Sequence, residues 1–159
     1  MTRPIVILLV EDREDDITVI RRAFRQAFLN NPLHVVRDGE EAVAYLNGMG
    51  QYANRDEYPL PDLILLDLKM PKMDGFEFLE WLREQPGINK IAVVVLTSSD
   101  QLRDVNRAYA MGANSFLVKP TDFQNYINLS KLVNDYWIRT SRLPEAERPA
   151  AKRKRPTEE

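Results

Sequence analysis

Short apolar runs that alternate with segments of helical spacing limit the possible folds more than any other feature of this chain. The first run, Ile5–Val10, is unbroken and rich in β-branched residues, which is typical of a strand buried on both faces of a parallel sheet. Behind it, Ile17, Ile20, Phe24 and Phe28 recur at spacings of three and four, which predicts one face of a helix.

The same alternation continues to residue 140. The later strands are predicted at Leu33–Val36, Leu63–Leu66, Ile91–Leu96 and Ser115–Val118. Helices are predicted after them around residues 42–46, 76–82, 102–109 and 121–140. Because each strand reaches the next through a helix, the pattern predicts an α/β fold with a doubly wound parallel sheet of five strands.

Length and composition favour one folded domain. A chain of 159 residues can bury a substantial core, and we expect this domain to span residues 1–140. Residues 141–159 hold three prolines and the basic cluster 152–155, and we expect a flexible, solvated C-terminal tail there. The connection 49–61 is unusually long, and we favour an ordered surface insertion over a binding loop.

Composition also excludes several classes of function. The chain has no cysteine, so it can form neither a disulfide nor a thiolate metal site. A net charge of −2 gives the whole molecule no attraction to nucleic acid or to an anionic membrane. The first apolar run is too short for a signal peptide or a spanning helix. We therefore expect a cytoplasmic protein with no membrane segment.

Polar side chains gather where the predicted strands end. In a parallel α/β sheet, ligands bind beyond the carboxyl ends of the strands. Those ends carry Glu11 and Asp12, then Asp67, Thr97 and Lys119. Each alone is weak evidence, since an aspartate after a strand is often only a helix cap or a turn former. Together they predict one polar site at one edge of the sheet.

The charges of this site call for a cation. Three carboxylates within about 4–6 Å repel one another by several kcal/mol in total, so a cation or a retained proton is needed. The only histidine, His34, lies on the second strand and has no ligand partner in the sequence. Oxygen ligands without histidine or cysteine suit Mg²⁺ or Mn²⁺ and do not suit zinc.

Four short motifs resemble those of a two-component response-regulator receiver domain. They are Leu9–Asp12, Leu65–Gly75, Val95–Ser98 and Val118–Pro120. The resemblance covers residues 4–140 and implies a flavodoxin-like (βα)5 sheet with strand order 2-1-3-4-5.

The resemblance also implies roles for the site residues. Asp67 would be the phosphoacceptor, with Mg²⁺ bound by Asp12, Asp67, the backbone carbonyl of Lys69 and, through water, Glu11. Thr97 and Lys119 would hold the phosphoryl oxygens, and the Lys119–Pro120 peptide bond would be cis. Phe116 falls at the aromatic switch position of the family. Two positions depart from the commonest pattern: Glu11 replaces an aspartate, and Phe116 replaces a frequent tyrosine.

The function that follows is that of a single-domain response regulator. A sensor histidine kinase would donate the phosphoryl group, and the regulator would signal through protein–protein contacts, without a DNA-binding domain. The domain would be no enzyme beyond transferring the group to itself and losing it slowly by autodephosphorylation. The long insertion and last helix resemble the small stand-alone regulators of bacterial and cyanobacterial phytochrome kinases.

Three alternative functions share parts of this pattern. A haloacid-dehalogenase-type hydrolase needs a second acid two residues after its nucleophile, where this chain has Lys69. A phosphate-independent pseudo-receiver scaffold would not need the intact set of acids, Thr97 and Lys119. A flavodoxin is excluded because no phosphate-binding loop follows the first strand.

The last predicted helix carries more apolar surface than one buried face requires. Leu129, Leu132 and Tyr136 widen its apolar arc beyond the stripe that covers the sheet. We predict that these three side chains form a homodimer interface. The alternative is that the C-terminal tail folds back over them.

Overall fold

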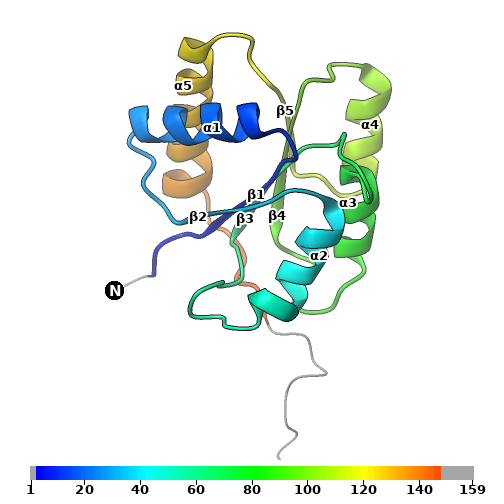
Figure 1. The fold of residues 1–159 in the computed structure, drawn as a ribbon. Helices are drawn as coiled ribbons and strands as arrows, with labels where there is room; N and C mark the ends of the chain where they lie inside the picture. The colour runs from blue at the N-terminus through cyan, green and yellow to red at the C-terminus, as the bar shows by residue number, and fades with distance from the viewer. Residues whose placement is uncertain (1–2, 148–159) are drawn as a thin grey trace, which may run out of the picture.

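The computed structural model describes residues 3–147, in which five parallel strands form one sheet between two layers of helices (Figure 1). The strands are β1 (Ile7–Val10), β2 (Leu33–Val36), β3 (Leu63–Leu66), β4 (Ala92–Thr97) and β5 (Ser115–Val118). Their order across the sheet is β2-β1-β3-β4-β5, and all four pairings are parallel. The predicted fold and strand order are therefore confirmed.

The helices divide between the two faces of the sheet. They are α1 (Glu14–Gln26), α2 (Gly39–Asn47), α3 (Gly75–Arg83), α4 (Leu102–Ala110) and α5 (Phe123–Leu132). Helices α1 and α5 cover one face, and α2, α3 and α4 cover the other (Figure 1). A short 3-10 helix, η1 (Gly50–Tyr52), follows α2, and α5 continues into η2 (Val133–Thr140), which has π-helical hydrogen bonding.

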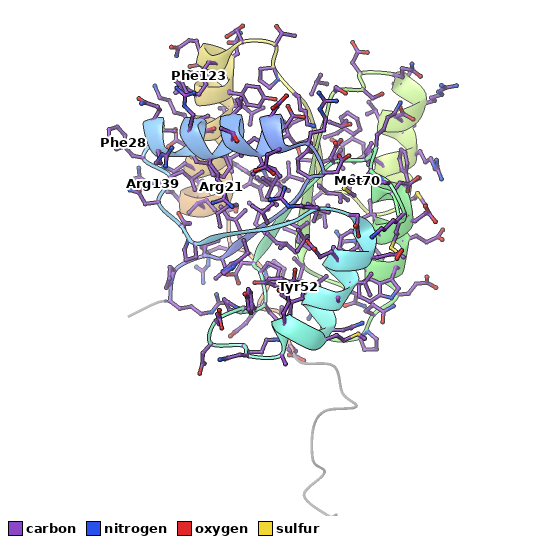
Figure 2. All side chains as sticks on the ribbon, in the orientation of Figure 1. Arg21, Phe28, Tyr52, Met70, Phe123 and Arg139 are labelled. Atoms are coloured by element: carbon purple, nitrogen blue, oxygen red, sulfur yellow. The ribbon has the colours of Figure 1, made fainter. Side chains whose placement is uncertain are left out.

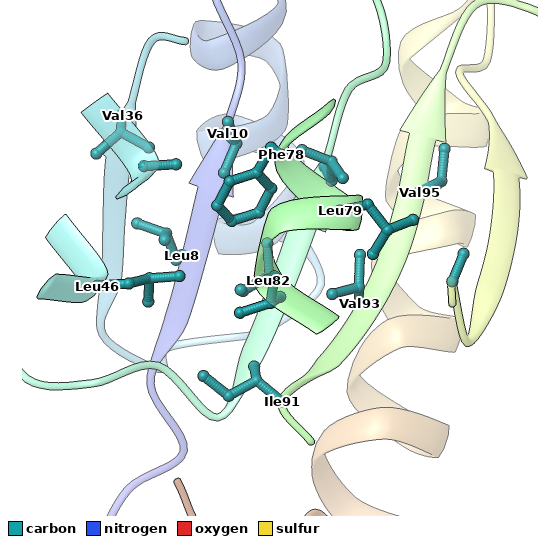
Figure 3. Close-up of a cluster of buried hydrophobic side chains, with 14 of the residues drawn as sticks. Leu8, Val10, Val36, Leu46, Phe78, Leu79, Leu82, Ile91, Val93 and Val95 are labelled. Carbon is teal, nitrogen blue, oxygen red and sulfur yellow. The ribbon is translucent and has the colours of Figure 1, made fainter. Parts of the chain in front are cut away.

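Two apolar cores result from the alternation of side chains along each strand. On β1, Leu8 and Val10 point into the core under α2 and α3, while Ile7 and Leu9 point into the core under α1 and α5. Figure 3 shows the first core, in which Phe78 of α3 packs among strand side chains. Burial on both faces explains why these strands are continuous apolar runs.

Aspartates start three of the helices. Asp38, Asp74 and Asp122 each accept a hydrogen bond from the backbone N–H three residues later, at 2.8–2.9 Å. Such caps satisfy backbone donors that a helix start leaves free. Because each cap follows a strand after a few residues, the connecting loops all lie at the carboxyl edge of the sheet.

Helix α1 ends earlier than the sequence pattern predicts. The pattern places Phe28 on the buried face of the helix, but Phe28 lies beyond the end of α1 and is 81% exposed. Its φ is +59°, and the N–H of Leu29 donates to the carbonyl of Phe24 at 2.9 Å, which closes the helix end. Leu29 is buried instead, because the left-handed residue turns the next side chain inward.

The long connection after α2 is packed against the domain. Arg55 donates hydrogen bonds to the carbonyls of Tyr45 (2.8 Å), Leu46 (2.6 Å) and Tyr58 (3.1 Å). Tyr52, which Figure 2 labels beside α2, packs 5.0 Å from the ring of Tyr45 and 5.1 Å from that of Tyr58. The connection is thus a packed surface element.

The first seven residues of the predicted tail run from one helical layer to the other. Leu143 packs against the core under α1 and α5, and Ala146 against the opposite core. The N–H of Glu147 donates to the carbonyl of Gly87 at 2.7 Å. The rest of the predicted tail, including the basic cluster 152–155, lies outside the described residues. Every helix within residues 3–147 is too short or too polar to span a bilayer.

Candidate functional site at the carboxyl edge of the sheet

The register of the central strands brings the two buried acids together. Val10 of β1 pairs with Leu66 of β3, so the residues that follow them, Glu11 and Asp67, are neighbours. The N–H of Asp67 donates to the carbonyl of Val10 at 3.0 Å, which extends the ladder by one residue. Both side chains are buried although both are acidic.

Lys119 reaches the same point from the edge strand. Val118 of β5 pairs with Thr97 of β4, and the Lys119 N–H donates to the carbonyl of Thr97 at 2.7 Å. The Lys119 Nζ then lies 3.0 and 3.1 Å from the two carboxylate oxygens of Glu11 and 3.2 Å from Asp67 Oδ2. Five expected site residues therefore share one edge.

The expectation of a cis bond before Pro120 is wrong for this structure, because no peptide bond among residues 3–147 is cis. The trans form is the more stable one even before proline, by about 0.5–1 kcal/mol. With the trans bond, the Lys119 ammonium still reaches both buried acids.

Three carboxylates form a group that can hold a metal ion. Glu11, Asp12 and Asp67 each offer one oxygen, and these oxygens lie within 4.8 Å of one another. Asp12, Asp67 and Lys69 line a cleft of about 610 Å³ together with Lys119. Lys69 is therefore beside the acids, and the role of its backbone carbonyl as a ligand stays a prediction.

Burial and charge perturb the groups at the site. Burial raises the pKa of the Glu11 carboxyl to about 8, and the neighbouring Asp67 carboxylate adds to the effect. For Lys119, burial alone would lower the pKa, but the hydrogen bond to Asp16 and the charges of Asp67 and Glu11 raise it above its ordinary value. One lysine thus leaves the acids short of positive charge.

Two buried oxygens at this edge lack a partner among the described protein groups. They are Oδ1 of Asp12 and Oγ1 of Thr97, and Thr97 is 0% exposed. An unsatisfied buried oxygen is costly, so its presence points to a group that the protein binds. The Asp12 oxygen, beside two further carboxylates, fits a hard divalent cation, and the Thr97 hydroxyl fits an anionic oxygen as acceptor.

Sequence reasoning missed one member of the cluster, Asp16. Its Oδ2 lies 2.8 Å from Lys119 Nζ and 3.5 Å from Nε of Arg13. In the sequence, Asp16 stands out only as part of an acidic stretch. The available signal was its position four residues before the buried Ile20, which places it beside the inward face of α1.

Phe116 and Thr97 lie toward the same core. Val95, two residues before Thr97 on β4, belongs to the core under α2 and α3, and Phe116 packs against that core from its paired position on β5. Phe116 is half-buried in this arrangement. Its part in a switch stays a prediction.

The three predicted interface residues differ in exposure. Leu132 is 66% exposed and Tyr136 is 56% exposed. Leu129 is half-buried and packs against the core under α1 and α5, so it is partly used within the domain.

Two exposed aromatic rings elsewhere, Phe28 and Phe123, lie at the end of α1 and the start of α5 (Figure 2).

Comparisons with known proteins find a matching family model and a similar protein. A family model described as "Response regulator receiver domain" matches residues 7–131. The response regulator Rcp1 of Synechocystis sp. is 36% identical over 143 residues, which cover 90% of this chain and 95% of Rcp1.

Two solved structures are similar to this chain in sequence and in fold. The phosphorylated cyanobacterial phytochrome response regulator RcpA is 36% identical and superposes with a TM-score of 0.82, covering 90% of this chain and 100% of RcpA. The Mn²⁺-bound form of Rcp1 is 35% identical with a TM-score of 0.79, covering 89% of this chain and 100% of that structure.

Proposed function

Since the chain belongs to the response regulator receiver domain family, we propose that it accepts a phosphoryl group on Asp67 and signals through a changed surface. The observation that carries this proposal is the buried cluster in which Asp67 lies between a lysine ammonium at 3.2 Å and two further carboxylates. A buried nucleophile flanked by cation sites is what phosphoryl transfer requires, because catalysis there is mostly positioning and charge neutralisation.

Each residue of the site has a separate role in the proposed transfer. The N–H of Leu68 donates to Asp67 Oδ1 at 2.8 Å and fixes the orientation of the carboxylate. An Asp67 oxygen attacks the phosphorus of a phosphohistidine, an O–P bond forms as the P–N bond breaks, and the leaving imidazole takes a proton from solvent. Lys119 stabilises the negative charge on the phosphoryl oxygens, and the Thr97 hydroxyl donates to one of them.

We propose Mg²⁺ as the resident cation, with Mn²⁺ as a substitute. Asp12, Asp67 and the carbonyl of Lys69 would bind it, and Glu11 would contact it through water. When bound, the cation supplies the positive charge that the acids lack and neutralises charge on the transferring group. The Mn²⁺-bound form of the relative Rcp1 and the unpartnered Asp12 oxygen support this assignment.

A labelling experiment tests the assignment of Asp67. The protein is incubated with Mg²⁺ and acetyl phosphate, and its intact mass is measured. Wild type should gain the mass of one phosphoryl group, while Asp67→Asn, which keeps the shape of the side chain, should gain none. A matched control is Asp62→Asn, since Asp62 is also buried but pairs with Arg3 instead. Equal labelling of Asp67→Asn would overturn the assignment.

We further propose a sensor histidine kinase of the phytochrome type as the donor, because the similar protein RcpA is a phytochrome response regulator. Phosphorylation would draw the Thr97 hydroxyl toward the phosphoryl group, and Phe116 would then turn inward and change the face of α4, β5 and α5. Output would pass through protein contacts on that face. A phosphate-independent scaffold would have no use for the buried acids and lysine.

A homodimer through the last helix is part of the proposal. Leu132 and Tyr136 provide exposed apolar surface on neighbouring turns of the α5–η2 helix, and Tyr136 packs edge-on against Trp137 with ring centroids 5.0 Å apart. A few such anchors typically supply most of the energy of an interface. Leu129 would contribute through the part of its side chain that the core leaves exposed.

A further inference from the structure

Asp16 makes the shortest contact to Lys119, yet the proposed phosphoryl transfer assigns it no role. Asp16 Oδ2 accepts a hydrogen bond from Lys119 Nζ at 2.8 Å, shorter than the contacts of Nζ with Glu11 (3.0 and 3.1 Å) and Asp67 (3.2 Å). Asp16 comes from α1, Glu11 from the end of β1, and Asp67 from the end of β3. The lysine is thus held by three different segments.

An ammonium group has only three N–H donors. In this structure one points to the Glu11 carboxylate, one to Asp16 and one to Asp67. Two anchors, Glu11 and Asp16, fix the rotation of the ammonium and so direct the third donor at Asp67. If Asp16 were removed, one donor would be free and the ammonium could rotate about its last carbon–nitrogen bond and shift toward Glu11.

Asp16 stands apart from the cation site. The oxygens that gather within 4.8 Å of one another come from Glu11, Asp12 and Asp67, without Asp16. The oxygen that accepts from Lys119, Oδ2, also lies 3.5 Å from Nε of Arg13, so the charge of Asp16 is shared between a lysine and an arginine. Its carboxylate therefore pairs with cationic side chains and does not belong to the group of metal-binding oxygens.

We propose that Asp16 is a positioning residue for phosphoryl transfer, which holds the Lys119 ammonium so that its remaining N–H points to the place where the phosphoryl oxygens arrive. The inference rests on the proposed role of Asp67 as phosphoacceptor. During transfer, Asp16 and Glu11 keep their hydrogen bonds, and only the third donor passes from Asp67 to a phosphoryl oxygen. Lys119 then changes partner without changing place.

A purely electrostatic role for Asp16 predicts the opposite sign. Asp16 adds a negative charge to a cleft that must admit an anionic phosphodonor. If charge alone mattered, its removal would speed phosphorylation, and the effect would shrink at high salt. A positioning role instead predicts slower transfer at every ionic strength, because a small misplacement of a charged group is costly in rate.

The experiment compares Asp16→Ala and Asp16→Asn with Asp15→Ala. Asp15 is exposed in the same first turn of α1, and its side chain has no hydrogen bond or ion pair with another residue in the range 3–147, so its variant controls for the loss of a negative charge at the helix start. Phosphorylation by acetyl phosphate is followed by intact mass at low and high salt. In parallel, the Lys119 ammonium is observed by ¹⁵N–¹H NMR, with Lys119→Met for assignment, and Mg²⁺ affinity is measured by calorimetry.

Asp16→Ala should label about 10-fold more slowly than Asp15→Ala at both salt concentrations, and Asp16→Asn, which retains an acceptor, about 3-fold more slowly. The ammonium protons of Lys119 should exchange faster with water in Asp16→Ala, while Mg²⁺ affinity stays within about twofold of the Asp15→Ala value. If wild type is labelled and Asp16→Ala labels as fast as Asp15→Ala, this inference is overturned and the proposed function stands. The same holds if the ammonium signal of Lys119 is unchanged in Asp16→Ala. An unlabelled wild type would overturn the proposed function and the inference with it.

Discussion

The start of α3 lies so close to the phosphoacceptor loop that a single methyl group at Gly75 should disturb it. A Cβ at Gly75 would lie 2.3 Å from the carbonyl oxygen of Asp67 and 2.7 Å from Cα of Leu68. The Gly75 N–H also donates to the Leu68 carbonyl at 2.9 Å, so the two segments are tied together at this point. Gly75→Ala therefore forces the added methyl group against the backbone of Asp67 and Leu68.

The size of the effect follows from these distances. To restore ordinary van der Waals separation, the two segments must move apart by about 1 Å. Strand β3 is paired on both sides, so α3 and the Asp67–Leu68 peptide must take up the movement. Leu68 N–H orients Asp67 Oδ1, and a misplacement near 1 Å in a catalytic group costs about 100-fold in rate. Overpacking of this kind also lowers the free energy of unfolding by about 1–3 kcal/mol.

The assay separates the loss of stability from the loss of geometry. Gly50→Ala is the control, because Gly50 has a φ of +57°, a Cβ added there would meet no atom within 4 Å, and the residue lies in η1, away from the acids. That variant should lose about 1 kcal/mol from backbone strain and keep its labelling rate. Gly75→Ala should label about 10- to 100-fold more slowly in a quantitative acetyl phosphate time course. If both variants label at the wild-type rate, the close approach at Gly75 does not position Asp67.

Four other predictions concern single side chains. Phe28→Gly should raise the free energy of unfolding by about 1 kcal/mol in denaturant titrations, because Phe28 is exposed and holds a φ of +59°; a loss of stability would contradict this account of the end of α1. Burial lowers the pKa of His34 from its ordinary 6.5, so the unfolded chain takes up the proton first and the free energy of unfolding should fall as the pH drops below about 6.5. His34→Gln should lack this part of the pH dependence, and identical curves would count against it. Asp12→Asn should weaken Mg²⁺ binding about tenfold or more in calorimetry, and an unchanged affinity would remove Asp12 from the ligands. Leu132→Glu should turn a dimer into a monomer in sedimentation without unfolding it, while a wild type that is monomeric at all concentrations would refute the dimer.

Periodicity and strand ends were enough to predict a parallel α/β sheet and to place most of the candidate site residues at one edge, while the strand order came from the family resemblance. Buried parallel strands must be apolar throughout, so runs such as Leu63–Leu66 can be recognised as strands from the sequence. The residue after each run then falls at the carboxyl edge of the sheet. This local rule places Asp67 and Lys119 at the same edge before any contact is known. The rule works because neighbouring parallel strands of this sheet are paired with little offset, so their carboxyl ends lie close together.

The differences arose where a tertiary choice decides the local structure. Phe28 and Leu29 are both apolar, and the left-handed turn at Phe28 determines that Leu29 is the one that joins the core under α1 and α5. In the sequence, Asp16 looks like one of several solvated acids, because its partner Lys119 follows β5 and is 103 residues away. The spacing from Ile20 places Asp16 beside the inward face of α1, but it does not identify the lysine that Asp16 contacts.

The unpartnered hydroxyl of Thr97 gives the proposed switch an energy scale. A buried hydroxyl without a partner costs about 1–3 kcal/mol, which is roughly 5- to 150-fold in an equilibrium constant. Among residues 3–147 this hydroxyl has no protein partner, so a phosphoryl oxygen that accepted its hydrogen bond would remove such a cost. Reversing a two-state population from 1:99 to 99:1 takes about 5.5 kcal/mol, so one satisfied hydroxyl would supply a sizeable share of it. In the proposed switch, this cost would lower the free energy that a single phosphoryl group has to supply to change the population.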